Sequence, residues 1–117
     1  MKKWIIWATT MVVMQVAHAD TAWLTTRVLA TKVMADPGQG GCLAKLAVNF
    51  QQQLPLCKAD CVTFSCTGKF ASKDIAYRMF DLAQMALALD HQVNLQISDL
   101  RMHNGFCFAK QIIVMNE

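Results

Sequence analysis

The sequence predicts a small α+β domain that is mainly β, in which a single helix follows the third of five strands. Two observations lead to this prediction. Polar and apolar residues alternate in four segments, which is the period of a strand with one buried face, and a fifth segment near the C-terminus is almost continuously apolar. One stretch between the third and fourth of these segments instead repeats its apolar residues at helical spacing.

Residues 1–19 have the organisation of a secretory signal peptide. Two lysines precede an uncharged apolar run, and Ala17 and Ala19 supply the small residues of a cleavage site. The run is interrupted by polar residues and is shorter than the roughly 20 apolar residues that a spanning helix needs. We therefore expect residues 20–117 to form one exported domain, periplasmic or extracellular, without a membrane span.

The expected mature chain is nearly neutral. Of the 117 residues, 98 remain after cleavage, which suffices for one small domain. Nine basic side chains then face eight acidic ones, because two of the eleven lysines and arginines leave with the leader. No basic stripe remains, so we expect neither a nucleic acid nor an anionic membrane as a partner.

The first predicted strand runs from Trp23 to Met34. Its polar and apolar residues alternate until the pattern slips near Thr31–Val33, where Lys32 falls on the apolar side. A bulge or a strong bend is expected at that point. A turn rich in glycine follows at Asp36–Gly41.

The second and third strands are predicted on either side of a cysteine-containing loop. Residues Cys42–Phe50 alternate cleanly, and Gln51–Pro55 breaks the pattern. A short third strand covers Val62–Cys66, with Thr63 and Ser65 expected on its outer face.

The helix is predicted to begin after Ser72, a favourable N-cap, with Asp74 in its first turn, and to end near Leu89. Its apolar arc covers roughly 180° of the helix surface, which is wide for a helix that lies on one small sheet. Either the helix plugs a tightly curved barrel, or a neighbouring subunit covers one flank of it. The residues of the arc are Ile75, Met79, Phe80, Leu82, Ala83, Ala86, Leu87 and Leu89.

Two strands complete the pattern. Residues Val93–Ser98 alternate strictly between apolar and polar, and Asp99–Gly105 is expected to form a connecting loop. In Phe106–Met115 both the odd-numbered and the even-numbered positions are mostly apolar, as in a strand buried on both sides. Three strands, one helix and two strands are the order of an OB-type five-stranded barrel. The alternative is a flat or strongly curved α+β sheet with one covering helix.

All five cysteines fall within residues 20–117, and an exported domain of this size commonly uses disulfides. The odd number leaves one thiol unpaired within the chain. The preferred pairing is Cys42–Cys66 with Cys57–Cys61, which leaves Cys107, and a rival set joins Cys66 to Cys107. A zinc site using Cys57 and Cys61 with His91 or His103 is the less favoured alternative, so we expect no metal and no cofactor.

Trp23 is the first candidate for a binding residue. An aromatic face stacks on sugars and hydroxyl groups hydrogen-bond them, so Trp23 with Thr25 and Thr26 forms a plausible carbohydrate-contact edge. The alternative is that Trp23 closes one end of the barrel.

A second candidate is the polar group Asp99, Arg101, His103 and Asn104 in the expected loop, which could bind a ligand or could simply stabilise a solvated turn. No nucleophile, base and orienting acid stand in a known catalytic pattern. We therefore expect no enzyme activity.

The layout resembles the B subunits of subtilase-cytotoxin and pertussis-like AB5 toxins, and related small exported bacterial proteins. The resemblance rests on Gly41–Lys45, Phe64-Ser65-Cys66, Phe80–Gln84 and Val93–Ile97 in their order along the chain. It implies an OB-type barrel, a ring of five subunits, and a shallow site for host glycans on the side of the barrel. The expected function is thus an exported, oligomeric module that binds a glycan or an exported protein, and a monomeric periplasmic accessory or inhibitor-like protein is the alternative.

Overall fold

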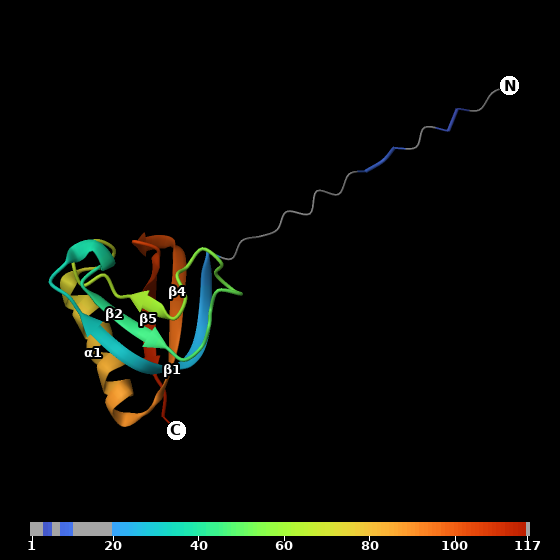
Figure 1. Ribbon diagram of the computed structural model, residues 1–117. Coiled ribbons are helices and arrows are strands. Elements are labelled where there is room, and N and C mark those ends of the chain that lie inside the picture. Colours follow the sequence, from blue (N-terminus) through green and yellow to red (C-terminus); the bar gives the residue numbers. More distant parts are fainter. Residues whose placement is uncertain (1–3, 6–7, 11–19, 117) are drawn as a thin grey trace.

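The computed structural model describes residues 4–5, 8–10 and 20–116, so the predicted signal peptide and its cleavage site lie almost wholly outside the described residues. The predicted order of three strands, one helix and two strands is confirmed (Figure 1). A short 3₁₀ turn lies between the first two strands. The elements are β1 (Thr21–Val33), η1 (Pro37–Gln39), β2 (Cys42–Leu46), β3 (Cys61–Thr63), α1 (Lys73–Leu89), β4 (Gln92–His103) and β5 (Phe106–Val114).

The five strands form one mixed sheet in the order β1-β2-β3-β5-β4. Because β4 pairs back with β1, the hydrogen-bonded neighbours close into a ring, which a flat sheet could not do. Four of the strand pairs are antiparallel, whereas β3 and β5 run parallel and share a single register pair, Thr63 with Phe108. The prediction of a mainly β domain with one helix is confirmed.

Strand β1 takes part in both halves of the ring. Its first half pairs with β4 and its second half with β2, and Figure 1 shows the strand bending between the two. The register shifts between Val28 and Ala30, which leaves Leu29 as the extra residue. The predicted slip near Thr31–Val33 was thus placed too late. A bulge at Leu29 turns Ala30 outward together with Lys32, so no lysine points into the core.

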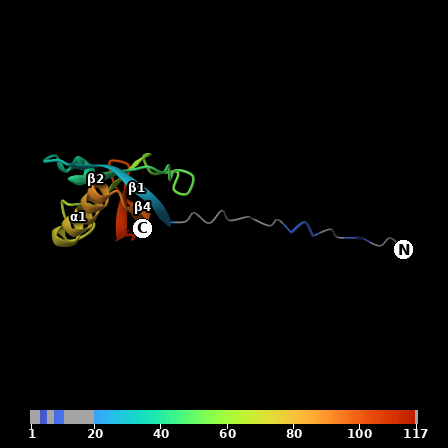
Figure 2. The ribbon, with the colours of Figure 1, turned by 90° about the horizontal axis from the view of Figure 1, so that it is seen from below.

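The core fills the inside of the ring, and two chain segments cover its opposite ends. In both views the strands lie between α1 at one end of the ring and the segment 47–60 at the other (Figures 1 and 2). Phe50 and Leu54 of that segment are fully buried, so the loop between β2 and β3 contributes to the core as a strand or helix would.

The helix begins and ends where the sequence predicts. The Ser72 hydroxyl oxygen accepts a hydrogen bond from the Ile75 N–H, and Asp90 closes the last turn in a left-handed conformation. The apolar arc, however, is only partly covered, because Ile75 and Leu89 are 50% and 58% exposed. The buried residues of α1 are Ala76, Met79, Phe80, Ala83 and Ala86.

One of the two preferred disulfides is confirmed and the other is wrong. Cys42 pairs with Cys66, with Cα atoms 5.7 Å apart, but Cys57 pairs with Cys107 at 5.4 Å, and Cys61 is the free thiol. The loop before β3 folds against the start of β5, where the Lys58 N–H donates to the Gly105 carbonyl, and this brings Cys57 to Cys107. With Cys57 bridged, the zinc alternative is excluded.

The end of β3 and the residues after it are covered instead of exposed. Thr63 and Ser65 were expected on an outer face, yet both are fully buried. The Thr63 hydroxyl donates to the Cys42 carbonyl, and Gly40 packs so closely on Thr63 and His103 that no side chain would fit there. The turn after β1 therefore covers this stretch, which the alternation pattern alone does not reveal.

The last two strands also differ from the prediction. The expected loop Asp99–Gly105 is mostly strand, since β4 continues to His103 and only the Asn104–Gly105 turn, with φ values of 53° and 85°, connects it to β5. Burial on both faces of β5 is limited to Cys107–Ala109, and Ile113 is about half exposed. The covered stretch is the one that the Cys57 loop crosses.

Removing the Cys57–Cys107 bridge by replacing both residues with serine should lower the free energy of unfolding by about 2–5 kcal/mol. The bridge joins residues 50 positions apart, and its loss frees that loop in the unfolded chain. Cys61→Ser is the matched control and should change the free energy of unfolding by less than about 0.5 kcal/mol. Urea unfolding followed by circular dichroism measures both. Peptide mapping that found Cys61 in a bridge would contradict this pairing.

Candidate functional site

The outer surface of β1, β4 and β5 carries an aromatic ring among amide and hydroxyl groups. Trp23 lies opposite Gln96 and Thr25 opposite Asn94, while Gln96 lies opposite Gln111. Residues that are directly opposite in antiparallel strands share one face, so these side chains form a single surface, hereafter the Trp23 face. Trp23 is 48% exposed, which excludes the alternative that it closes one end of the ring.

The amide groups of the Trp23 face are already partly ordered. The Gln111 side-chain amide donates to the Gln96 side-chain oxygen over 2.9 Å. This bond leaves the NH₂ group of Gln96 and the carbonyl oxygen of Gln111 for a ligand. The face can therefore offer one aromatic surface with fixed donors and acceptors beside it.

Thr26, predicted to join Trp23 and Thr25, does not belong to this surface. Its side chain points into the ring and is 5% exposed. The Thr26 hydroxyl donates to the Arg27 carbonyl and accepts from the Val48 N–H, so it anchors the segment that follows β2. Alternation along β1 separates Thr26 from Trp23 and Thr25, which stand on the opposite side of the strand.

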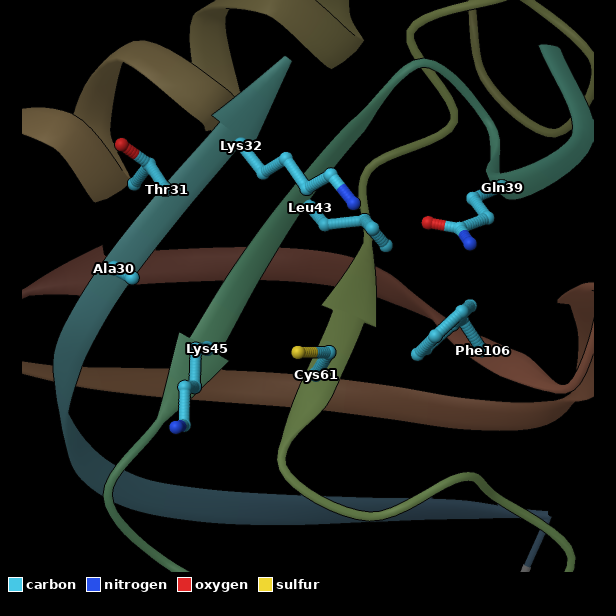
Figure 3. Close-up of a pocket in the computed structure, with 8 residues that line it drawn as sticks. All are labelled: Ala30, Thr31, Lys32, Gln39, Leu43, Lys45, Cys61 and Phe106. Atoms are coloured by element: carbon cyan, nitrogen blue, oxygen red, sulfur yellow. The ribbon is translucent and has the colours of Figure 1, made fainter. Parts of the chain in front are cut away.

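A second surface, which the sequence did not reveal, is a cavity of about 270 Å³ on the outer side of β1, β2 and β3 (Figure 3). Beyond the bulge, Ala30 pairs with Lys45 and Lys32 pairs with Leu43. Lys45 in turn pairs with Cys61 of β3. We refer to this cavity as the lysine pocket. The sequence pattern predicts that Leu43 and Lys45 point outward from the second strand. Only the position of the bulge shows that Ala30 and Lys32 lie on the same outer surface.

The far wall of the lysine pocket comes from two other elements. Phe106, at the start of β5, closes one side, and the Gln39 side chain of η1 points into the cavity opposite the Lys32 amino group, whereas the Lys45 amino group lies at the other end (Figure 3). Lys58 reaches this wall as well, with its Nζ atom 4.9 Å from the centre of the Phe106 ring.

The Cys61 thiol lies between the lysines. Burial and the Asp60 carboxylate raise the pKa of this thiol, while Lys45 and Lys32 act in the opposite direction. The Cys61 side chain is thus a thiol and not a thiolate at neutral pH, and both lysines are close enough for their charges to act on it.

The predicted polar group on β4 is not assembled in the structure. Asp99 lies beside Asp20 and Pro55 on another part of the surface. The Arg101 guanidinium donates to the Phe70 carbonyl over 3.3 Å, and Asn104 forms the turn to β5. In a regular strand Asp99, Arg101 and His103 would share one face. The register of β4 against β5 shifts between Ser98 and Met102, however, and this irregularity divides the group.

His103, the fourth member of that predicted group, is buried and belongs to an internal pair. Its Nε2 atom lies 2.8 Å from the Ser65 hydroxyl, whose oxygen also accepts the Phe70 N–H. The ring is 4.4 Å from that of Phe70, centre to centre. Burial, followed by repulsion from Lys69, lowers the pKa of His103. The pair has the residue types of a nucleophile and its base, but Ser65 is fully buried, so no substrate reaches it.

Over the described part of the chain, no group of three or more histidine, cysteine or acidic side chains is placed to hold a metal ion. The same residues include no helix that is both long and apolar enough to span a membrane. Comparison with protein-family models, curated proteins and solved structures finds no match to this chain.

The buried His103 should make the protein less stable in mild acid. The unfolded chain takes up a proton on this histidine below about pH 6.5, whereas the folded chain resists protonation to a lower pH. The free energy of unfolding therefore falls as the pH drops through and below about 6.5. Urea unfolding between pH 8 and pH 5 should show this loss in the wild type and in His91→Gln. His103→Gln should be less stable at pH 8 but lose less stability on acidification, and an unchanged pH profile in that variant would refute the assignment.

Proposed function

We propose that the protein is an exported, non-catalytic binding module that recognises a glycan on the Trp23 face and acts as a homo-oligomer. The observation that carries the proposal is the exposed Trp23 ring beside Thr25 and an ordered pair of glutamine amides. Sugars present apolar C–H faces and a rim of hydroxyl groups, and an aromatic ring flanked by amides matches both.

The fold we propose is the OB type. The circular strand order and the helix between β3 and β4 support it, as do the parallel pair β3–β5 and the bent β1 that pairs on both sides. Members of this architecture bind oligosaccharides and oligonucleotides on the outer surface of their barrels. The resemblance to AB5 toxin B subunits supports glycan recognition in particular.

Export and the absence of catalysis rest on separate features. Two disulfides suit a non-reducing compartment such as the periplasm or the cell exterior. The buried position of Ser65 supports a binding role, since the hydroxyl–imidazole pair of Ser65 and His103 is closed to substrates.

The oligomer proposal rests on an uncovered apolar flank of α1. Ile75, Leu82, Met85 and Leu89 lie on one side of the helix at 3.6 residues per turn. Of these, Ile75, Met85 and Leu89 are exposed large hydrophobic side chains. Apolar surface of this kind is buried in many subunit interfaces. Phe80, in contrast, packs inside the domain against Phe64, with ring centres 6.1 Å apart, and is not available to a neighbour.

Replacing Trp23 by alanine should weaken glycan binding about fivefold to tenfold, since the stacking surface is lost. The half-exposed ring contributes less than a core residue, so the free energy of unfolding should fall by less than about 1.5 kcal/mol. A glycan array, followed by calorimetry with the best ligand, measures the effect. Leu29→Ala, on the same strand with 53% exposure, is the control and should bind normally. Well-folded wild-type protein that bound no glycan on the array would leave an exported protein partner, and not a sugar, as the ligand.

Charging the exposed flank of α1 should dissociate the oligomer and leave a folded monomer. Ile75→Glu combined with Met85→Lys places each charge at the end of the helix that its dipole favours, so helix stability is retained. Native mass spectrometry and light scattering measure the assembly, and circular dichroism verifies the fold. A wild-type protein that stays monomeric at high concentration would refute the oligomer and favour the monomeric accessory protein.

A further inference from the structure

The lysine pocket combines an apolar lining with positive charge and is separate from the Trp23 face. Ala30, Leu43 and Phe106 are apolar residues of its lining. Leu43 points outward from β2, yet it is only 3% exposed, because the surrounding walls enclose it. An enclosed apolar floor of this kind favours a ligand with an apolar body over a fully hydrated one.

The positive charge around the pocket is not neutralised by an ion pair among the described residues. The described residues show no ion pair for Lys32 or Lys45, although they show ion pairs elsewhere, such as Arg78 with Asp74. Lys58 adds a third amino group at the Phe106 wall. Asp60 is the one carboxylate that acts on the Cys61 thiol together with the two lysines. Positive charge thus exceeds negative charge around the cavity, and the Gln39 amide faces it from η1.

A second cavity lined by basic side chains, about 360 Å³ between Phe70, Phe108 and β4, is less suited to an anion. Its Arg101 guanidinium already donates to the Phe70 carbonyl and lies over the Phe70 ring. Only Lys110 remains there with no contact of that kind among the described residues. Of these two cavities, the lysine pocket is therefore the better anion site.

We propose that the lysine pocket binds a small organic anion in which a carboxylate is carried on a flat, apolar body. The carboxylate lies between Lys32 and the Gln39 amide, where a charge and a neutral donor converge, and the apolar body rests on Leu43 and Phe106. The site goes beyond the proposed glycan recognition, since it lies on the second half of β1 with β2 and β3, whereas the Trp23 face lies on the first half with β4 and β5.

Cys61 makes occupancy of the pocket measurable, because it is the free thiol and lines the cavity. The rate of its alkylation by iodoacetamide is measured on the mature protein with increasing 1-naphthoate, 1-naphthalenemethanol or inorganic phosphate. Naphthoate should slow alkylation in a saturable manner, with an affinity about tenfold higher than that of the neutral alcohol. Added sodium chloride should weaken the protection. Equal protection by the alcohol, equal protection by phosphate alone, or no protection by naphthoate would overturn the proposal.

Three variants locate the anion. Lys32→Gln with Lys45→Gln should weaken naphthoate binding about tenfold, measured by calorimetry, whereas Lys110→Gln removes one charge from the other cavity and should leave the affinity unchanged. If Lys110→Gln weakened naphthoate binding instead, the anion would lie in the second cavity, and the proposal would be refuted. Both lysines of the pocket are exposed, so circular dichroism should show wild-type folding in every variant. Trp23→Ala should bind naphthoate normally, which separates this test from that of the glycan site.

Discussion

The bend in β1 is the constraint on which the rest of the structure depends. A single strand pairs with β4 along its first half and with β2 along its second, and only a strand that changes direction can join both sides of the ring. The extra residue at Leu29 provides that change and increases the local twist. The same residue decides which side chains are outside, since Ala30 and Lys32 reach the surface only because the phase shifts there. The bulge at Leu29 is thus responsible both for ring closure and for the position of the lysine pocket.

The opposite side of the ring is held by other means. The parallel contact between β3 and β5 consists of one register pair, and β3 spans only Cys61–Thr63. Three features around this short seam join the segments on either side of β3 to the end of β4 and the start of β5. The Cys57–Cys107 bridge crosses on one side, the Lys58 N–H donates to the Gly105 carbonyl beside it, and the Ser65–His103 pair links the residues after β3 to the end of β4. Covalent and buried polar contacts here replace the ladder of hydrogen bonds that longer strands would share.

Local patterns in the sequence predicted the elements but not the contacts between them. The helix limits and the inward side of β2 follow from capping and alternation, which act over neighbouring residues. The Cys42–Cys66 bridge follows from the pairing of β2 with β3, the next strand along the chain. Errors arose wherever a distant segment decides the outcome. Thr63 has the alternation of a surface residue, but the turn containing Gly40 covers it. Cys61 is nearer to Cys57 along the chain, yet Cys57 is bridged to Cys107. Of the candidate residues, Trp23 and Thr25 lie on one face of β1, and strand alternation separates Thr26 from them. The polar group is divided by the shift in the register of β4 between Ser98 and Met102, within a segment that was expected to be a loop.

If the chain is exported as proposed, the two bridges differ in when their partner cysteines become available. In a chain that crosses a membrane from its N-terminus, Cys42 and Cys66 emerge 24 residues apart and precede the whole of α1, whereas Cys107 is among the last residues to follow. Until it arrives, Cys57 has the Cys61 thiol four residues away as its nearest available partner. An oxidising compartment would favour that premature pairing, and the native bridge would then form by exchange with Cys107. Under the proposed export, the unpaired Cys61 thiol would thus compete with Cys107 for Cys57 until the end of the domain has emerged.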